Sequence, residues 1–353
     1  MFQDFFLNRF RPLLDNSRQN NIDLLRAVAV LSVVIHHTQH VFGGDVPFLG
    51  NAGGWFGVQL FFVISGYLIA ASAERYPLRD FAIHRFFRIA PAYLFFFLAI
   101  GIASKVISFH KIVEDPAAFL INLTFLQHLF PEALLKFNAL NVSWTLTVEV
   151  IWYAAVPLLL VGNRKIGWPT VVVVLCVSTA WSFAASRHWL DFIAPTLAKT
   201  DPGRFYLFIN NGFFAQAVFF IFGAWIHFNR RLIENLNPLS TVMLSLVILM
   251  AMPYYLLFNP LFITGISISL MLITAINSKP IFNKFVFVIS ETSYAIYLVH
   301  FPAILWVYYR LGIKGFEGAA IALSVTLLLA VFSYALIEKP CMEIGRKLTK
   351  KHS

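Results

Sequence analysis

Charged residues and cysteines are scarce in this chain. Asp, Glu, Lys and Arg make up 12% of its 353 residues, whereas apolar residues make up 59%. The shortage of charge excludes an ordinary soluble domain, in which about a quarter of the residues are charged. The two cysteines, Cys176 in an apolar run and Cys341 near the C-terminus, give no support to a disulfide framework. The N-terminus also lacks the pattern of a cleavable signal peptide, so we expect the first apolar segment to be retained.

Apolar runs of about eighteen residues or more recur along the whole chain, and each is long enough to cross a bilayer. We therefore predict an all-α polytopic membrane bundle of about ten helices. One membrane domain is expected over 1–353, with a cytoplasmic N-terminal segment at 1–21 and a basic cytoplasmic tail at 339–353 that forms a short helix or coil. The predicted spans are 22–42, 55–74, 87–108, 145–162, 168–186, 205–227, 239–257, 259–277, 286–309 and 316–338.

Two segments leave the span pattern open. The stretch 117–130 is too short and too polar to cross comfortably, so we expect an interfacial or re-entrant helix on the external side. The pair within 239–277 is weakly separated by Asn259 and Pro260, and it also fits one long interrupted helix.

The distribution of Lys and Arg predicts the orientation. Ten spans with the N-terminus inside place 18 of these residues in cytoplasmic segments and eight outside. Cytoplasmic loops of membrane proteins are enriched in Lys and Arg, so both termini are expected to be cytoplasmic. The formal net charge of +10 is thus explained by topology, and no nucleic-acid partner is expected.

The first span carries ionisable residues that a membrane helix ordinarily avoids. Arg26, His36 and His37 lie within 22–42, and an Arg at a helix centre costs roughly 2.5–3.5 kcal/mol on insertion scales. Eleven residues separate Arg26 from His37, close to three helical turns, so both point the same way about 16 Å apart. Such a face favours a functional site or pathway.

Other polar residues add candidates with competing interpretations. Arg85 and Arg88 share a helix face at the cytoplasmic surface, where they form either a topological anchor or a clamp for phosphate. Glu149 lies inside the fourth span and needs a partner or a water-filled cavity. Ser143 is placed to cap that helix.

Further along the chain, His300 lies in the middle of the ninth span, where a neighbouring hydroxyl often satisfies a lone histidine. Glu338 fits a helix-end anchor at the cytoplasmic surface better than a catalytic group. Gly57, Ser65 and Gly66 in the second span are small enough for close helix packing.

Five segments occur in an order that resembles the acyltransferase 3 family of integral membrane acyltransferases. They read IDLLRAVAVLSVVIHH, GVQLFFVISGYLI, HRFFRIAPAY, VSWTLTVEVIWYAAVP, and SYAIYLVHFP followed by IEKP. The resemblance implies about ten spans and an O-acetyltransferase in the bacterial cytoplasmic (inner) membrane. It implies a cytosolic acyl-CoA donor, usually acetyl-CoA, and a carbohydrate acceptor such as a lipopolysaccharide O-antigen or an exopolysaccharide. The chain looks like a stand-alone member without the fused hydrolase-like domain.

The resemblance also implies roles for residues at matching positions. The family spacing of Arg, ten residues and His selects Arg26 and His37 rather than His36. His37 is expected to act as general base or as transient acyl carrier, and Glu149 to orient His37 or to bind the acceptor. The remaining expectations are Arg26, Arg85 and Arg88 for acyl-CoA binding and Ser143, Trp144 and His300 for substrate binding. The bilayer is the expected environment, no metal is expected, and the oligomeric state stays open.

Two rival classes use the same residues. A secondary transporter or proton-coupled permease would use the intramembrane Arg, His and Glu as an ion path. A haem protein would use His37 and His300 as axial ligands on different helices. Consumption of labelled acetyl-CoA separates an acyltransferase from a transporter, and absorbance of the membranes in the visible range would reveal a haem.

Overall fold

The computed structural model describes residues 20–251, 260–281 and 283–350, and within these ranges the ordered elements are helices without strands. The longer helices are α2 (Asn20–Phe42), α3 (Leu49–Arg75), α4 (Leu78–Ala103), α8 (Trp144–Lys165), α9 (Pro169–Ser186), α12 (Phe213–Phe228), α14 (Pro238–Ala251), α15 (Pro260–Asn277), α17 (Ser293–Trp306) and α18 (Gly315–Ser333). The shorter ones are α5 (Phe109–Glu114), α6 (Pro116–Leu123), α7 (Pro131–Lys136), α10 (Pro195–Thr200), α11 (Pro202–Asn210), α13 (Arg230–Ile233), α16 (Lys284–Glu291) and α19 (Lys339–Lys350).

The predicted all-α membrane bundle is confirmed. Within the described ranges, six helical segments are long and apolar enough to cross a membrane, or seven if the bent pair α16 and α17 counts as one span. Each of the ten predicted spans overlaps a helix. Helix α2 is not among the six, which fits the ionisable residues that it carries.

Three predicted spans differ in detail from the helices that form. The segment 205–227 divides into α11 and α12 at Asn211 and Gly212, where Gly212 has extended backbone. The segment 286–309 bends by 71° between α16 and α17. Helices α14 and α15 pack side by side, joined by hydrogen bonds between Ser245 and Ser267, so this pair is not one long helix. Residues 252–259, which connect them, lie outside the described ranges.

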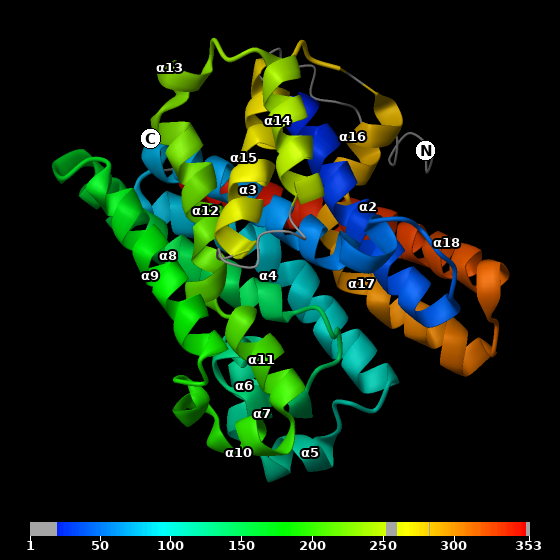
Figure 1. Ribbon diagram of the computed structural model, residues 1–353. Helices are drawn as coiled ribbons and strands as arrows, with labels where there is room; N and C mark the ends of the chain where they lie inside the picture. The colour runs from blue at the N-terminus through cyan, green and yellow to red at the C-terminus, as the bar shows by residue number, and fades with distance from the viewer. Residues whose placement is uncertain (1–19, 252–259, 282, 351–353) are drawn as a thin grey trace.

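The short helices α5, α6, α7, α10 and α11 gather at one end of the bundle, opposite α13 (Figure 1). Four of them, α5, α6, α7 and α10, come from two loops that the charge distribution predicts to be external, and α11 overlaps the start of the predicted span 205–227. The stretch 117–130 forms α6 and a helical turn rather than one continuous helix. Asp115 begins α6 by accepting a hydrogen bond from the backbone N–H of Ala118, which lowers the pKa of the Asp115 carboxyl.

Close helix packing through glycines is confirmed around α3. A Cβ atom on Gly66 would lie 2.1 Å from the carbonyl oxygen of Phe220, and one on Gly223 would lie 2.0 Å from that of Val63. Such distances mean that only glycine permits the approach of α3 to α12, as is common at membrane helix interfaces. Gly57 likewise faces the carbonyl of Ala29 on α2. Helix α3 is therefore held tightly between α2 and α12.

Candidate functional site

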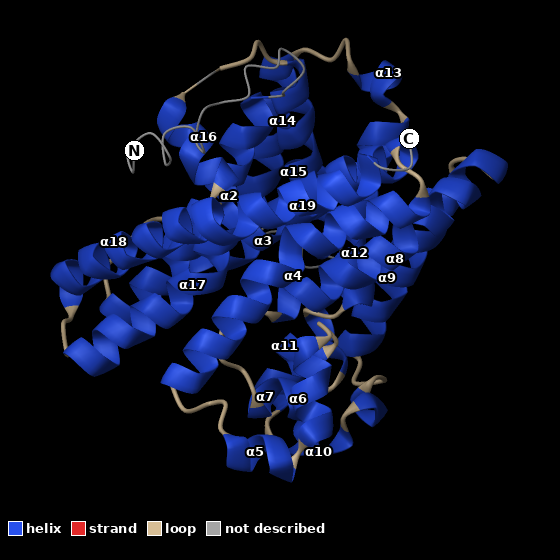
Figure 2. Ribbon diagram, turned by 180° about the vertical axis from the view of Figure 1, so that it is seen from behind, coloured by secondary structure: helices blue, strands red, loops and turns tan. Residues whose placement is uncertain are grey.

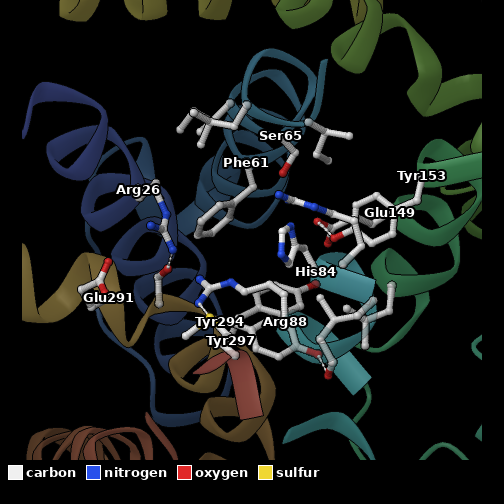
Figure 3. Close-up of a pocket in the computed structure, with 18 of the residues that line it drawn as sticks. Arg26, Phe61, Ser65, His84, Arg88, Glu149, Tyr153, Glu291, Tyr294 and Tyr297 are labelled. Carbon is white, nitrogen blue, oxygen red and sulfur yellow. Dashed lines mark hydrogen bonds between the residues drawn. The ribbon is translucent and has the colours of Figure 1, made fainter. Parts of the chain in front are cut away.

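A cavity of about 650 Å³ lies within the bundle, lined by residues of α2, α3, α4, α8, α16, α17 and α19. Its volume is in the range of about 300–1,000 Å³ that is typical of ligand pockets. Figure 3 shows Arg26 on one side of it and Glu149 with Tyr153 on the opposite side. The charged residues that line it are Arg26, Arg85, Arg88, Glu149, Glu291, Lys339, Glu343 and Arg346. The structure therefore brings together all three arginines that were predicted to bind acyl-CoA.

Arg26 is held by groups at the bend between α16 and α17. Its Nη2 donates a hydrogen bond to Oγ of Ser293 at 2.9 Å, and its Nη1 lies 4.0 Å from the carboxylate of Asp23. Ser290 in turn donates to Asp23 at 2.7 Å. This network fixes the guanidinium at the cavity wall. The sequence reasoning missed Asp23, although its position one helical turn before Arg26 is a signal for pairing.

Arg85 and Arg88 project from the second and third turns of α4. Arg85 Nη2 donates to Oγ of Ser72 at 3.0 Å, and its buried Nε has no hydrogen-bond partner in the described part of the chain. Arg88 Nη1 donates to the thioether sulfur of Met342 at 3.3 Å, and sulfur is a weak acceptor. Both guanidinium groups thus face the cavity with donors that an anionic ligand would satisfy better than their present neighbours.

Glu149 belongs to this charged cavity. The hydroxyl of Tyr153, one turn further along α8, donates to its carboxylate at 2.6 Å, and its nearest charges are Arg85, Arg88 and Arg26. The carboxylate therefore faces the arginine cluster and pairs with Tyr153, a residue not singled out from the sequence.

Ser143 does precede α8, but the predicted capping bond is wrong, because its side chain makes no capping hydrogen bond. The carbonyl of Ser143 accepts a bond from Gln127 instead.

Glu338 is not a surface anchor. Its side chain is 1% exposed and accepts a hydrogen bond from Ser333 at 3.1 Å. The chain passes through a π-helical turn at Tyr334–Glu338 and continues directly into α19, which directs this carboxylate inward. There it interacts electrostatically with Arg88. A π-helical turn cannot be recognised from the residue pattern, and the prediction that Glu338 lies at the surface was therefore wrong.

The C-terminal helix α19 forms part of the cavity wall and lies against α4 (Figure 2). The residues that face the cavity recur every three or four positions and are Lys339, Met342, Glu343, Arg346 and Thr349. His84 Nε2 lies 3.0 Å from the hydroxyl of Thr349 and ties the end of this helix to α4. Of the two forms expected for the tail, helix or coil, the structure has a helix over Lys339–Lys350, and this helix contributes Arg346 to the charged lining.

His37 lies outside the cavity lining, in a separate pair with His300. Nδ1 of His37 is 2.9 Å from Nε2 of His300. Arg26 and His37 do face the same neighbour, because they contact Ser293 and His300 of α17. Tyr297 lines the cavity, and its ring centroid is 5.8 Å from that of His300. The histidine pair thus lies directly behind one wall of the cavity.

The two neighbouring histidines of α2 have different surroundings. His36 points toward α3, where its Nδ1 donates to the carbonyl of Gly50 at 2.9 Å. His36 therefore does not share the face of α2 on which Arg26 and His37 contact α17, as the spacing of Arg26 and His37 predicts. The separation of 2.9 Å between His37 and His300 is also too short for two ligands on opposite sides of one metal, which need about 4 Å.

Trp144 is the first residue of α8. Its ring packs against Phe62 at 6.3 Å and His128 at 5.8 Å between ring centroids. Burial lowers the pKa of His128 to about 4, so this imidazole is neutral near pH 7. Its Nε2 donates to the carbonyl of Phe208 at 3.0 Å. Trp144 therefore connects the helical turn at Gln127–Leu129 to helix α3.

Comparison with known proteins decides the family. Residues 19–338 match the family model described as an acyltransferase domain, Acyl_transf_3. The chain belongs to the acyltransferase 3 family. The resemblance expected from the motifs is confirmed, and this membrane domain is an acyltransferase domain.

Curated relatives of this acyltransferase 3 chain come from Staphylococcus aureus. The strain COL protein named "Putative O-acetyltransferase SACOL0978" is 26% identical over 372 residues, which cover 92% of this chain and 58% of that protein. "O-acetyltransferase OatA" of strain MRSA252 is 23% identical over 366 residues, covering 94% of this chain and 59% of OatA. The chain thus spans less than two thirds of the length of these relatives. No solved structure matches it.

Proposed function

We propose that this protein is a membrane O-acetyltransferase. It moves an acetyl group from cytosolic acetyl-CoA to a hydroxyl of a surface or periplasmic carbohydrate across the bacterial inner membrane. The observation that carries the proposal is the cavity, because four arginines from three helices line it and the ring centroid of Tyr297 in its wall lies 5.8 Å from that of His300. The names of the relatives, both of which contain the word O-acetyltransferase, support acetyl as the transferred group.

The charged lining suits the phosphates of a CoA donor. Guanidinium groups form forked hydrogen bonds with phosphate oxygens, and Arg85, Arg88 and Arg346 line the same cavity. All three lie in segments that the charge distribution places on the cytoplasmic side. The pantetheine arm would extend from them toward Phe61 and Tyr297, two aromatic residues of the same lining. The thioester would then reach the wall that the histidine pair adjoins.

The proposed reaction needs one proton acceptor. Nε2 of His37 takes the proton of the acceptor hydroxyl while the hydroxyl oxygen attacks the thioester carbonyl carbon. The carbon–sulfur bond breaks, the acetyl ester forms, and the CoA thiolate leaves. The proton held by His37 passes to the thiolate, so that CoA and the acetylated carbohydrate are the products. Because Tyr297 lines the cavity and its ring adjoins that of His300, this ring would have to move when the reactants meet at His37.

The direct test is transfer of label from [¹⁴C]acetyl-CoA, added on the cytoplasmic side of inverted membrane vesicles, to the glycan fraction. Vesicles with the protein should incorporate label into base-labile esters, and vesicles without it should not. Hydrolysis of those esters would return free acetate. A secondary transporter would leave acetyl-CoA unconsumed, and that result would overturn the proposal.

A further inference from the structure

His300 has one side of its ring fixed by backbone. The side chain is fully buried, and its Nδ1 lies 2.8 Å from the carbonyl oxygen of Tyr297 and 3.2 Å from that of Ile296. A carbonyl oxygen can only accept a hydrogen bond. Nδ1 of His300 therefore carries the hydrogen.

The protonation of one ring nitrogen determines that of its partner. A neutral imidazole with hydrogen on Nδ1 offers a lone pair at Nε2. That lone pair of His300 faces Nδ1 of His37 at 2.9 Å, so Nδ1 of His37 is the donor. The remaining nitrogen of His37, Nε2, is then left with a lone pair. This is the tautomer that a general base requires.

The chain of bonds differs from the usual arrangement in which a carboxylate orients a histidine. The titratable groups that act on His37 are His36 and His40 on its own helix and His300 on α17. A permanent anion within a membrane helix is costly, whereas a carbonyl and a neutral imidazole orient the ring without adding charge.

We propose that His300 is a positioning residue for the reaction. His300 donates from Nδ1 to the Tyr297 carbonyl and accepts at Nε2 from Nδ1 of His37. These two bonds hold His37 in the tautomer whose Nε2 accepts the hydroxyl proton. The inference rests on the proposed function, since it assumes that His37 is the base. When His37 accepts that proton, the bond from its Nδ1 to His300 strengthens and stabilises the imidazolium.

Three substitutions of His300 separate an acceptor role from a packing role. Gln places a carbonyl oxygen near the position of Nε2, Asn is too short to reach it, and Leu fills the space without an acceptor. Turnover of [¹⁴C]acetyl-CoA is measured in vesicles with equal protein content. His300→Leu and His300→Asn should lower kcat about 100-fold, as loss of groups that orient a functional histidine does. His300→Gln should stay within about tenfold of the parent protein, and KM for acetyl-CoA should be unchanged in all three.

The outcomes distinguish this inference from the proposed function. Full turnover in His300→Leu, or equal losses in Gln and Asn variants of equal thermal stability, overturns the positioning role. If His37→Ala is also inactive, the proposed function survives that result. Full turnover in His37→Ala would instead overturn the base assignment and the inference together. If His300→Leu fails to fold, the comparison of His300→Gln with His300→Asn still tests the positioning role.

Discussion

The charged cavity and the histidine pair are two polar regions of one bundle, and they are built in opposite ways. The cavity holds arginines and carboxylates from several helices around a volume of about 650 Å³. The pair holds two imidazoles in direct contact, one of them fixed by backbone carbonyls. In the first region charged side chains surround an open cavity, whereas in the second region two hydrogen-bonded imidazole rings leave no cavity between them.

Under the proposed function, this difference assigns binding of the acetyl-CoA donor to the cavity and the chemical step to the histidine pair. A cavity rich in guanidinium groups stabilises an anion that enters and leaves. A packed pair of neutral rings holds a proton acceptor in one orientation. Substitutions in the first region should therefore change the affinity for the donor, and substitutions in the second should change the rate of the chemical step.

The largest effect is expected for His37→Ala. Removing a general base should lower turnover by about 10²–10⁴-fold, while binding of acetyl-CoA persists because His37 does not line the cavity. Turnover and donor binding are measured on the same vesicle preparations. Loss of donor binding in this variant would break the separation of the two regions.

The reverse pattern is expected for Arg88→Ala. Loss of a charge-assisted phosphate contact of about 1.5–3 kcal/mol should weaken acetyl-CoA binding by roughly 10- to 100-fold. Turnover at saturating donor should change much less. Arg79→Ala is the matched control, since Arg79 lies on the same helix but does not line the cavity. Unchanged binding in Arg88→Ala would favour a purely topological role for this residue.

Glu149→Gln decides to which region this carboxylate belongs. Removing a negative charge among three arginines should tighten binding of the anionic donor by about threefold, a modest electrostatic effect in a hydrated site. Tyr153→Phe removes the hydrogen bond to Glu149 and keeps the charge, so it should leave the affinity closer to that of the parent. A loss of turnover as severe as that of His37→Ala, with unchanged affinity, would assign Glu149 to the histidine pair instead.

The smallest effect is expected for His36→Ala. Its ring bonds the Gly50 carbonyl on α3 and points away from α17, so turnover should remain within about threefold, the scale of a surface-type substitution. Rates are compared with those of His37→Ala in matched membranes. Equal losses in both variants would remove the preference for His37.

The sequence alone predicts the class of fold and four of the charged residues that line the cavity, Arg26, Arg85, Arg88 and Glu149. Long apolar runs specify membrane helices, and the positions of Arg26, Arg85 and Arg88 suffice to place them on one side of the bundle. The periodicity of α2 correctly predicts that Arg26 and His37 share a face, because helix geometry is regular over eleven residues.

The remaining parts depend on contacts between distant segments. Nothing local indicates that Glu338 turns inward, since a π-helical turn has no distinctive residue pattern. The partner of His37 comes from a helix more than 260 positions away. The pairing of Glu149 with Tyr153 has helical spacing, but many such pairs in apolar helices only fill space. Tertiary packing therefore decides which polar residues meet.

The bend between α16 and α17 has an energetic consequence for the living cell. A break of 71° interrupts backbone hydrogen bonds within the membrane, and such a break is tolerated beside a cavity that admits water. Glu291 and Ser293, on either side of the break, do line the cavity. The cavity is therefore where water can satisfy the backbone groups freed by the break, and the rings of Phe61 and Tyr297 line the same cavity. Under the proposed function, the acetyl group must pass the ring of Tyr297 to reach His37 without opening a path for protons that would discharge the membrane potential.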